Sequence, residues 1–271
     1  MRQRVRGALA SSGLVPSEGR VLLAHVLNRD RSWLIAHSDD ELTPAQAKAF
    51  EALTRRRHNG APIAYLTGRR EFYGLDLEVS PAVLIPRPET ELLVELALEH
   101  IGEGDSARVL DLGSGSGAIA LAIAHRRPRC SVVGVDVSVE ALATARSNAQ
   151  RLNVSNVTFV ESDWFDNVPR DGFALIVSNP PYVANDDTHL AQGDLRFEPP
   201  GALKGGVDGL AAIRKIVAGA GGFLAPGGWL LIEHGYNQAE SVQALLVETG
   251  YSSLESRRDL AGILRVTFGR R

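Results

Sequence analysis

The tetrapeptide Asn179-Pro180-Pro181-Tyr182 combines residue types that could bind and activate a planar amine. Both prolines fix φ and lack an N–H, and Asn179, which precedes a proline, is pushed toward extended backbone. This stiff loop can hold the Asn179 side-chain oxygen and the Pro180 carbonyl so that they accept both hydrogens of an –NH₂ group, while Tyr182 stacks on its plane. The alternative interpretation is a rigid turn that only ends a strand.

An amide or aryl amine needs such help because its nitrogen lone pair is delocalised. Accepting its hydrogens returns electron density to nitrogen, and fixed positioning next to the electrophile can contribute roughly 7–11 kcal/mol. A sulfonium methyl donor suits this acceptor, since it requires only in-line attack and leaves as a neutral thioether. No metal or strong base is demanded, and the seven histidines are scattered along the chain.

A glycine-rich loop lies between an apolar stretch and the helical pattern of residues 118–124. Glycines let the backbone turn sharply and approach a ligand, and a helix N-terminus offers free N–H groups. A tight strand-to-helix turn would have the same composition. The candidate cofactor-binding residues of this loop are Gly113, Ser114, Gly115, Ser116 and Gly117.

Two further positions complete a candidate adenosine site. Asp136 follows the next apolar run at the distance where an acid would bind a ribose hydroxyl pair, although it could instead cap a helix, as could Ser138. Asp163 and Trp164 follow the third run, where a carboxylate could accept from the adenine amine and an indole could cover the base. A nicotinamide dinucleotide would also fit a loop with Ala118 in its last place, and the tetrapeptide favours the methyl donor over it.

The elements that must position these residues alternate along the second part of the chain. Short apolar runs of strand length are separated in part by helical stretches such as 139–152, which predicts a parallel sheet covered on both faces. A closing antiparallel pair is expected from 252–256 and 263–268. The other expected strands are 109–110, 132–135, 157–160, 174–177 and 229–232.

The first 70 residues have a different pattern, that of short helices. Ser17 is expected to cap one helix, and Thr43-Pro44 to open another that ends near His58. Residues 71–79 alternate as a hairpin would. The predicted domains are therefore a helical domain over 1–70, a hairpin linker over 71–90 and an α/β domain over 91–271.

Composition excludes several classes of protein. The 271 residues are 44% hydrophobic and 23% charged, which fits a globular chain and not a disordered, collagenous or membrane-spanning one. The one cysteine, Cys130, cannot form an internal disulfide, so a reducing, cytoplasmic location is expected. Residues 1–70 carry 12 Lys and Arg against 6 Asp and Glu; the remainder, 17 against 26, is acidic. The basic head could meet an acidic or RNA-rich partner or simply carry solvated charge.

With these motifs in place, the chain resembles the release factor glutamine methyltransferases within the amino-methylating, S-adenosylmethionine-dependent enzymes. The similarity extends over nearly the whole chain, including the helical head, which DNA and RNA amine methyltransferases would not be expected to share. Besides the tetrapeptide and the glycine loop, the supporting segments are 62–68, 71–74, 84–91, 198–199 and 205–210.

The resemblance implies a Rossmann-like, seven-stranded class I methyltransferase domain joined by a β-hairpin to a small helical bundle that recognises the substrate. It implies methylation of the side-chain amide of glutamine in the Gly-Gly-Gln motif of class I peptide chain release factors, with S-adenosylhomocysteine as the other product. Nucleic acid is not the expected substrate, and no membrane is involved.

The same resemblance assigns roles to residues. The loop from Gly113 to Gly117 would contact the methionine part of the cofactor, Asp136 its ribose and Trp164 its adenine. Asn179 would touch cofactor and substrate, with Pro180 as second acceptor and Tyr182 stacked on the substrate. These three are the expected catalytic residues, and with Pro181 they form the expected substrate-binding set.

Three questions stay open from sequence. Residues 183–210 form a long stretch that is either a substrate-gripping lid, which we favour, or disordered. Arg87 and Glu89 either contact the partner or pair with each other. Other functions remain conceivable, namely an adenine methyltransferase, a dehydrogenase or a non-catalytic adaptor. The acidic α/β part argues against a duplex binder, and the intact motifs argue against an adaptor.

Overall fold

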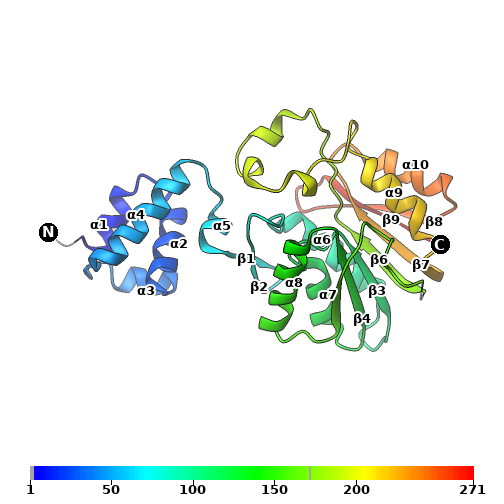
Figure 1. Cartoon of the computed structure of the whole chain (residues 1–271), viewed down its shortest axis with the longest axis horizontal. Helices are drawn as coiled ribbons and strands as arrows, with labels where there is room; N and C mark the ends of the chain where they lie inside the picture. Colours follow the sequence, from blue (N-terminus) through cyan, green and yellow to red (C-terminus); the bar gives the residue numbers. More distant parts are fainter. Residues whose placement is uncertain (1–2, 171) are drawn as a thin grey trace. The chain divides into compact units, whose positions relative to one another are not determined.

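The computed structural model describes residues 3–170 and 172–271, which form two compact units (Figure 1). One unit contains the residues up to Arg69 together with Gln192–Phe197. The other contains Arg70–Ala191 and Glu198–Arg271. No helix of the described residues combines the length and the apolar character that crossing a bilayer requires.

From residue 3 onward, the first unit is built from five α-helices around its own apolar core. Thr43 and Gln46 form a reciprocal capping box, and the helix that they start ends at His58, as predicted. The expected cap at Ser17 is wrong: the second helix already begins at Pro16, because proline is preorganised for the first helical position. The helices are α1 (Val5–Ser11), α2 (Pro16–Leu27), α3 (Arg31–Ala36), α4 (Pro44–His58) and α5 (Ile63–Thr67). Their core contains Val5, Ala8, Leu22, Leu23, Leu34, Leu42, Phe50 and Leu66.

The segment Gln192–Phe197 comes from the long stretch 183–210, yet it belongs to this helical unit. Arg57 of α4 pairs with Glu18 of α2 at 2.7 Å and with Asp194 of the segment at 3.2 Å. Arg196 donates a hydrogen bond to the Asn59 carbonyl at 3.0 Å. The stretch therefore has defined structure, which includes the 3₁₀ turns Thr188–Ala191, Leu195–Phe197 and Pro200–Ala202.

The predicted hairpin consists of β1 (Arg69–Phe72) and β2 (Leu75–Glu78), which belong to the second unit from Arg70 onward, and the chain continues through the 3₁₀ turn η1 (Pro88–Thr90) into α6 (Glu91–Glu99). Seven further strands form one sheet in the order β5-β4-β3-β6-β7-β9-β8. The strands are β3 (Arg108–Leu112), β4 (Ser131–Asp136), β5 (Val157–Glu161), β6 (Phe173–Ser178), β7 (Leu224–Glu233), β8 (Ser252–Arg258) and β9 (Leu264–Arg270). The other helices are α7 (Ala118–Arg126), α8 (Val139–Arg151), α9 (Ala211–Ala220) and α10 (Ala239–Glu248).

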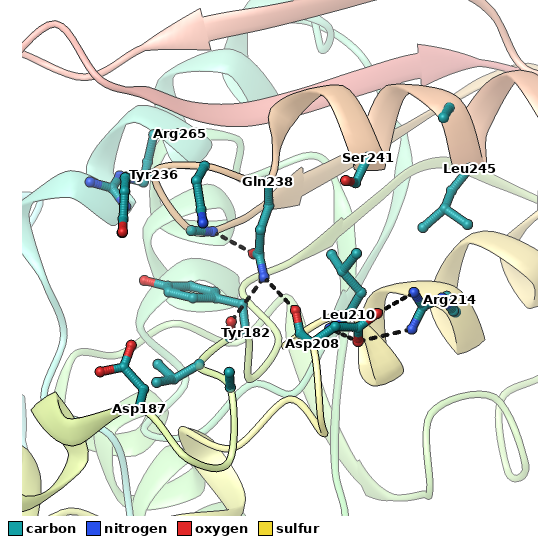
Figure 2. A pocket seen from close by; sticks show the side chains of 15 residues that line it. Tyr182, Asp187, Asp208, Leu210, Arg214, Tyr236, Gln238, Ser241, Leu245 and Arg265 are labelled. Atoms are coloured by element: carbon teal, nitrogen blue, oxygen red, sulfur yellow. Dashed lines mark hydrogen bonds and ion pairs between the residues drawn. The ribbon is translucent and has the colours of Figure 1, made fainter.

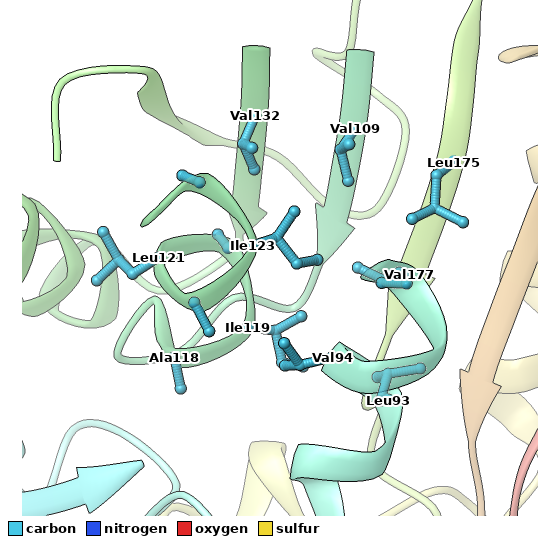
Figure 3. Close-up of a cluster of buried hydrophobic side chains, with 14 of the residues drawn as sticks. Leu93, Val94, Val109, Ala118, Ile119, Leu121, Ile123, Val132, Leu175 and Val177 are labelled. Atoms are coloured by element: carbon cyan, nitrogen blue, oxygen red, sulfur yellow. The ribbon is translucent and has the colours of Figure 1, made fainter. Parts of the chain in front are cut away.

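The topology confirms the predicted fold class. Strands β3 to β7 run parallel, and β9 pairs antiparallel with β7 and with β8. Apolar side chains of α6, α7 and α8 cover one face of the sheet, and those of α9 and α10 cover the other. Figure 3 shows part of the first face, where Ile119 and Ile123 of α7 and Val94 of α6 approach the strands at Val109 and Val177. Because the strand order reverses between β3 and β6, a ligand site is expected at the carboxyl ends of these strands.

Candidate active site

A cavity of about 280 Å³ lies at the carboxyl ends of β3, β4, β5 and β6. Most of the cofactor positions predicted from sequence meet in its wall, namely Gly113, Gly115, Asp136, Trp164 and Asn179. Ser114, Ser116 and Gly117 do not line it. The first two are buried, and Gly117 packs at the N-terminus of α7 against Phe159 and Ala145.

The glycine loop presents backbone to the cavity because of its local conformation. Gly113 has φ +75°, a value that L-residues rarely adopt, and its N–H donates to the Val135 carbonyl. A Cβ there would lie 3.8 Å from the Trp164 ring. Ser114 turns inward and donates to buried Asp111 at 2.8 Å. The loop therefore combines a backbone surface for a ligand with a side-chain anchor beneath it.

Asp136 is held at the end of β4 by two backbone donors. Its Oδ2 accepts from the Gly115 N–H at 2.8 Å and its Oδ1 from the Ser138 N–H at 2.9 Å. Ser138 caps α8 by accepting from Ala141, so Asp136 is not the helix cap. Each carboxylate oxygen keeps a second lone pair, which leaves Asp136 able to accept from a pair of hydroxyl groups.

The cavity wall also contains residues that the sequence reasoning did not assign to the cofactor. Ala82, Val83 and Leu84 line it from the connector, and Pro199, Gly201 and Ala202 line it from the end of the long loop. The only signal in the sequence was that segments 84–91 and 198–199 are shared with the family.

Buried Glu198 joins these two stretches. Its Oε2 accepts from the Ile85 N–H at 3.0 Å, and its Oε1 pairs with the Arg87 guanidinium. The expected alternative of an Arg87–Glu89 pair is therefore not formed. The Glu198 side chain is fully buried and requires a cation, and Arg87 supplies it.

The tetrapeptide lies between this cavity and a second one. Asn179 and Pro181 face the smaller cavity, and Tyr182 lines another of about 590 Å³. Asn179 Nδ2 donates to the Thr90 hydroxyl at 3.1 Å, while its Oδ1 accepts no hydrogen bond from the described residues. The carbonyl of Pro180, a buried residue, likewise accepts none from them. The two oxygens that sequence analysis singled out are therefore available to a ligand.

Tyr182 is fixed at the wall of the larger cavity, which Figure 2 shows with Asp187, Tyr236 and Arg265 around it. Its carbonyl accepts from Gln238 Nε2 at 3.1 Å, and the same amide reaches the Asp208 carbonyl at 3.4 Å. Gly209 has φ +75°, and a Cβ there would lie 2.3 Å from the Tyr182 carbonyl oxygen. Only glycine therefore permits this close approach of the long loop to the tetrapeptide.

A buried acid, Glu233, lies behind Tyr182 and was missed from sequence. The Tyr182 hydroxyl donates to its Oε1 at 3.3 Å. Burial raises the pKa of Glu233 to about 7, and the Thr90 hydroxyl and the charge of Arg265 oppose this rise. Asp111 beneath the glycine loop is also fully buried, and burial raises its pKa to about 7 against the hydrogen bond from Ser114.

The raised pKa of Glu233 predicts a pH-dependent stability. The folded protein retains a proton that the unfolded chain releases above pH 4.5, so stability is lost as pH rises toward about 7. The loss amounts to about 3 kcal/mol at 1.4 kcal/mol per pKa unit. We expect Glu233→Gln to remove that part of the change in unfolding free energy between about pH 4.5 and about pH 8. Urea denaturation at both pH values measures the unfolding free energies. Any effect of the new amide that is the same at both pH values cancels when the difference between them is taken. An unchanged difference would contradict the assignment.

Comparison with known proteins identifies the family to which this chain belongs. Residues 1–68 match the family model described as the PrmC N-terminal domain, and residues 89–196 match the methyltransferase small domain. A release factor glutamine methyltransferase of Bordetella pertussis is 51% identical over 266 residues, which cover 98% of each chain. The chain belongs to the release factor glutamine methyltransferase family. A second member, from Burkholderia pseudomallei, is 52% identical over 97% of this chain and 94% of its own.

Solved structures agree on the fold. A methyltransferase from Pyrococcus furiosus superposes with a TM-score of 0.57 at 22% identity and covers 80% of this chain and 96% of its own. The sequence predicted a class I methyltransferase fold. The order of the strands and the membership in the release factor glutamine methyltransferase family together confirm it. The chain is accordingly an S-adenosylmethionine-dependent methyltransferase.

Proposed function

We propose that this enzyme methylates the side-chain amide nitrogen of the glutamine in the Gly-Gly-Gln motif of class I peptide chain release factors, and so supports translation termination. The observation that carries the reaction is the anchoring of Asn179, whose Nδ2 is bound to Thr90 while its Oδ1 is left to accept. The nearly full-length similarity to relatives named release factor glutamine methyltransferases supports the substrate.

The smaller cavity suits S-adenosylmethionine in its chemistry. Asp136 can accept from the ribose hydroxyl groups, Trp164 offers an aromatic face for adenine, and the loop at Gly113 and Gly115 leaves room for the methionine part. The bound cofactor supplies an electrophilic methyl group on sulfur and leaves as a neutral thioether. Ser114 does not line the cavity. It contributes by its hydrogen bond to Asp111, which holds the glycine loop in place.

On the acceptor side, the protein has to make an amide nitrogen nucleophilic. Asn179 Oδ1 and the Pro180 carbonyl accept the two amide hydrogens, which returns lone-pair density to nitrogen. Tyr182 borders the larger cavity, from which we propose the release factor loop enters, and stacks on the amide plane. Pro181 keeps the loop stiff. The proton lost when the N–CH₃ bond forms passes to solvent.

We assign recognition of the release factor to the predicted helical domain, residues 1–70. Residues 1–70 carry 12 Lys and Arg against 6 Asp and Glu, a basic balance that suits contact with an acidic surface of the partner. The catalytic part needs no nucleic-acid surface under this proposal. A cytoplasmic location follows from a substrate that works on the ribosome.

Mass spectrometry of a purified release factor tests the proposal after incubation with this protein and S-adenosylmethionine. We expect one added methyl group, mapped to the glutamine of the Gly-Gly-Gln motif, and none on a factor whose glutamine is replaced. Methyl transfer to DNA or RNA with none to the release factor would overturn the substrate and leave the cofactor assignment intact.

A further inference from the structure

Gln238 lies at the N-terminus of α10, in the wall of the larger cavity, and has no role in the mechanism proposed above. The residue is only 8% exposed, so its amide needs hydrogen-bond partners within the protein. Its Oε1 accepts from the Gly235 N–H at 2.8 Å. Its Nε2 donates to the Tyr182 carbonyl at 3.1 Å and to the Asp208 carbonyl at 3.4 Å (Figure 2). One buried amide therefore connects three separate segments of the chain.

The orientation of the Gln238 amide is fixed, because its three partners are all backbone groups. A backbone N–H can only donate, and a backbone carbonyl can only accept. The –NH₂ group has two hydrogens, one for each of the two carbonyls. A flipped amide would set its –NH₂ against the Gly235 N–H and its oxygen against both carbonyl oxygens. The side chain is therefore held in one orientation without any contribution from an ionisable group.

The two carbonyls that Gln238 binds belong to segments that are packed closely together, the tetrapeptide and the end of the long loop. The Gly205 N–H of this loop end donates to the carbonyl of Val183, the residue after the tetrapeptide, at 2.8 Å. At Gly209, an added Cβ would lie 2.6 Å from Gln238 Nε2 and would also meet the Tyr182 carbonyl. A displacement of the loop end at Gly209 would therefore separate the Gln238 amide from one of its two acceptors.

We propose that Gln238 is a positioning residue, which places Tyr182 for stacking on the acceptor amide by joining its backbone to the end of the long loop. Gln238 binds backbone carbonyls and not the reacting atoms, so it acts through Tyr182. Asn179 is held separately, by the bond from its Nδ2 to Thr90, and the cofactor side of the tetrapeptide does not depend on Gln238. The inference rests on the proposed function, because it concerns the same acceptor amide.

Steady-state methylation of a release factor by purified variants tests the proposal. Gln238→Met keeps the length of the side chain and removes its hydrogen bonds. We expect it to lower kcat by about 10- to 100-fold, since misplacement by about 1 Å can cost roughly 100-fold. The KM for the release factor should change by less than about threefold, and the Kd for S-adenosylmethionine by less than about twofold. Gln238→Glu keeps the acceptor for the Gly235 N–H but loses the –NH₂ group, so it should not restore the rate at about pH 8.

A control variant and a double variant separate positioning from mere packing. Gln243→Met makes the same substitution in α10 and removes the bond from Gln243 Nε2 to Ser256 Oγ at 2.9 Å, but this residue lines neither cavity. Its kcat should stay within about twofold of the wild type. Gly209→Ala disturbs the same connection from the loop, so adding it to Gln238→Met should lower kcat little further. Full additivity of these two changes, or a raised KM with an unchanged kcat in Gln238→Met, would overturn the proposal.

A second measurement does not depend on turnover. The chain has five tyrosines, so protein labelled with fluorotyrosine gives a simple ¹⁹F NMR spectrum, in which the loss of one signal in Tyr182→Phe identifies Tyr182. This signal should shift or split in Gln238→Met and in Gly209→Ala and stay unchanged in Gln243→Met. A Tyr182 signal that is identical in all these proteins would overturn the inference. The expected shifts in an enzyme whose wild type leaves the release factor unmethylated would overturn the proposed function instead.

Discussion

Replacement of Asn179 by alanine is expected to lower kcat for release factor methylation by about 100- to 1000-fold, the loss seen when a preorganised polar group is removed from an active site. The side chain carries Oδ1, an acceptor that the bond from Nδ2 to Thr90 orients and that has no hydrogen-bond partner among the described residues. Without it, half of the interaction that makes the amide nitrogen nucleophilic is lost. Rapid-quench measurement of a single turnover with radiolabelled S-adenosylmethionine isolates this step from product release.

The affinity of the Asn179→Ala variant for S-adenosylmethionine serves as the control for this prediction. Asn179 is one of many residues in the wall of the smaller cavity, so the Kd for S-adenosylmethionine should rise by less than about tenfold in calorimetry. Asn179→Asp keeps the size but loses the Nδ2 donor and sets a second acid near Glu233, so it should not restore the rate. Wild-type single turnover in Asn179→Ala would remove Asn179 from the mechanism.

Local pattern was sufficient to predict the strands, the glycine loop and the tetrapeptide. Each of these is a short stretch in which periodicity or special residues determine the backbone. The sequence predicted that several of these residues follow the ends of strands. The structure has three of them at the cavity there, namely Gly113, Gly115 and Asn179. Asp136 also lines this cavity and does not cap α8, because Ser138 two residues later takes the capping role, and the binding of the ribose by Asp136 stays a prediction.

Contacts between distant parts of the chain could not be predicted in this way. Thr90 reaches Asn179 across 89 positions, and Glu198 reaches Ile85 across 113. In the sequence, Glu233 is simply the residue that ends an apolar strand. Only the pairing of β7 with β6 brings Glu233 behind the tetrapeptide. The cap predicted at Ser17 was wrong for a more local reason, since Pro16 allows the helix to begin one residue earlier.

Tyr182 and Asn179 border different cavities, and this division has a consequence for the mechanism. Asn179 and Pro181 line the smaller cavity and Tyr182 lines the larger one, so the peptide forms the wall between the proposed cofactor and acceptor sites. Proline at the two intervening positions removes backbone freedom from that wall. The Gln238 amide and the Glu233 carboxylate then hold its far end through Tyr182. Rigidity of this kind is what positioning catalysis requires, because a fixed geometry replaces the freedom that an unbound amide would have to lose.

Asp136→Ala is expected to weaken S-adenosylmethionine binding by about 10- to 150-fold, since hydrogen bonds to a charged group contribute about 1.5–3 kcal/mol. The change removes the proposed acceptor for the ribose hydroxyls. It also frees the Gly115 N–H, which the carboxylate holds at 2.8 Å, so the glycine loop loses its restraint. Asp136→Asn, which keeps one acceptor oxygen, should lie between the wild type and Asp136→Ala.

A matched aspartate separates loss of ligand contact from loss of backbone anchoring. Asp259 also accepts two backbone N–H groups, from Ala261 at 2.9 Å and Ile263 at 3.0 Å, and it lies outside the smaller cavity. Asp259→Ala should lower stability and leave the Kd for S-adenosylmethionine within about twofold. Calorimetry on both variants measures the affinity directly. A thermal-shift series should show the cofactor stabilising Asp259→Ala as much as the wild type and Asp136→Ala far less, because stabilisation depends on the ratio of ligand concentration to Kd. Equal stabilisation of all three proteins would place the ribose elsewhere in the cavity.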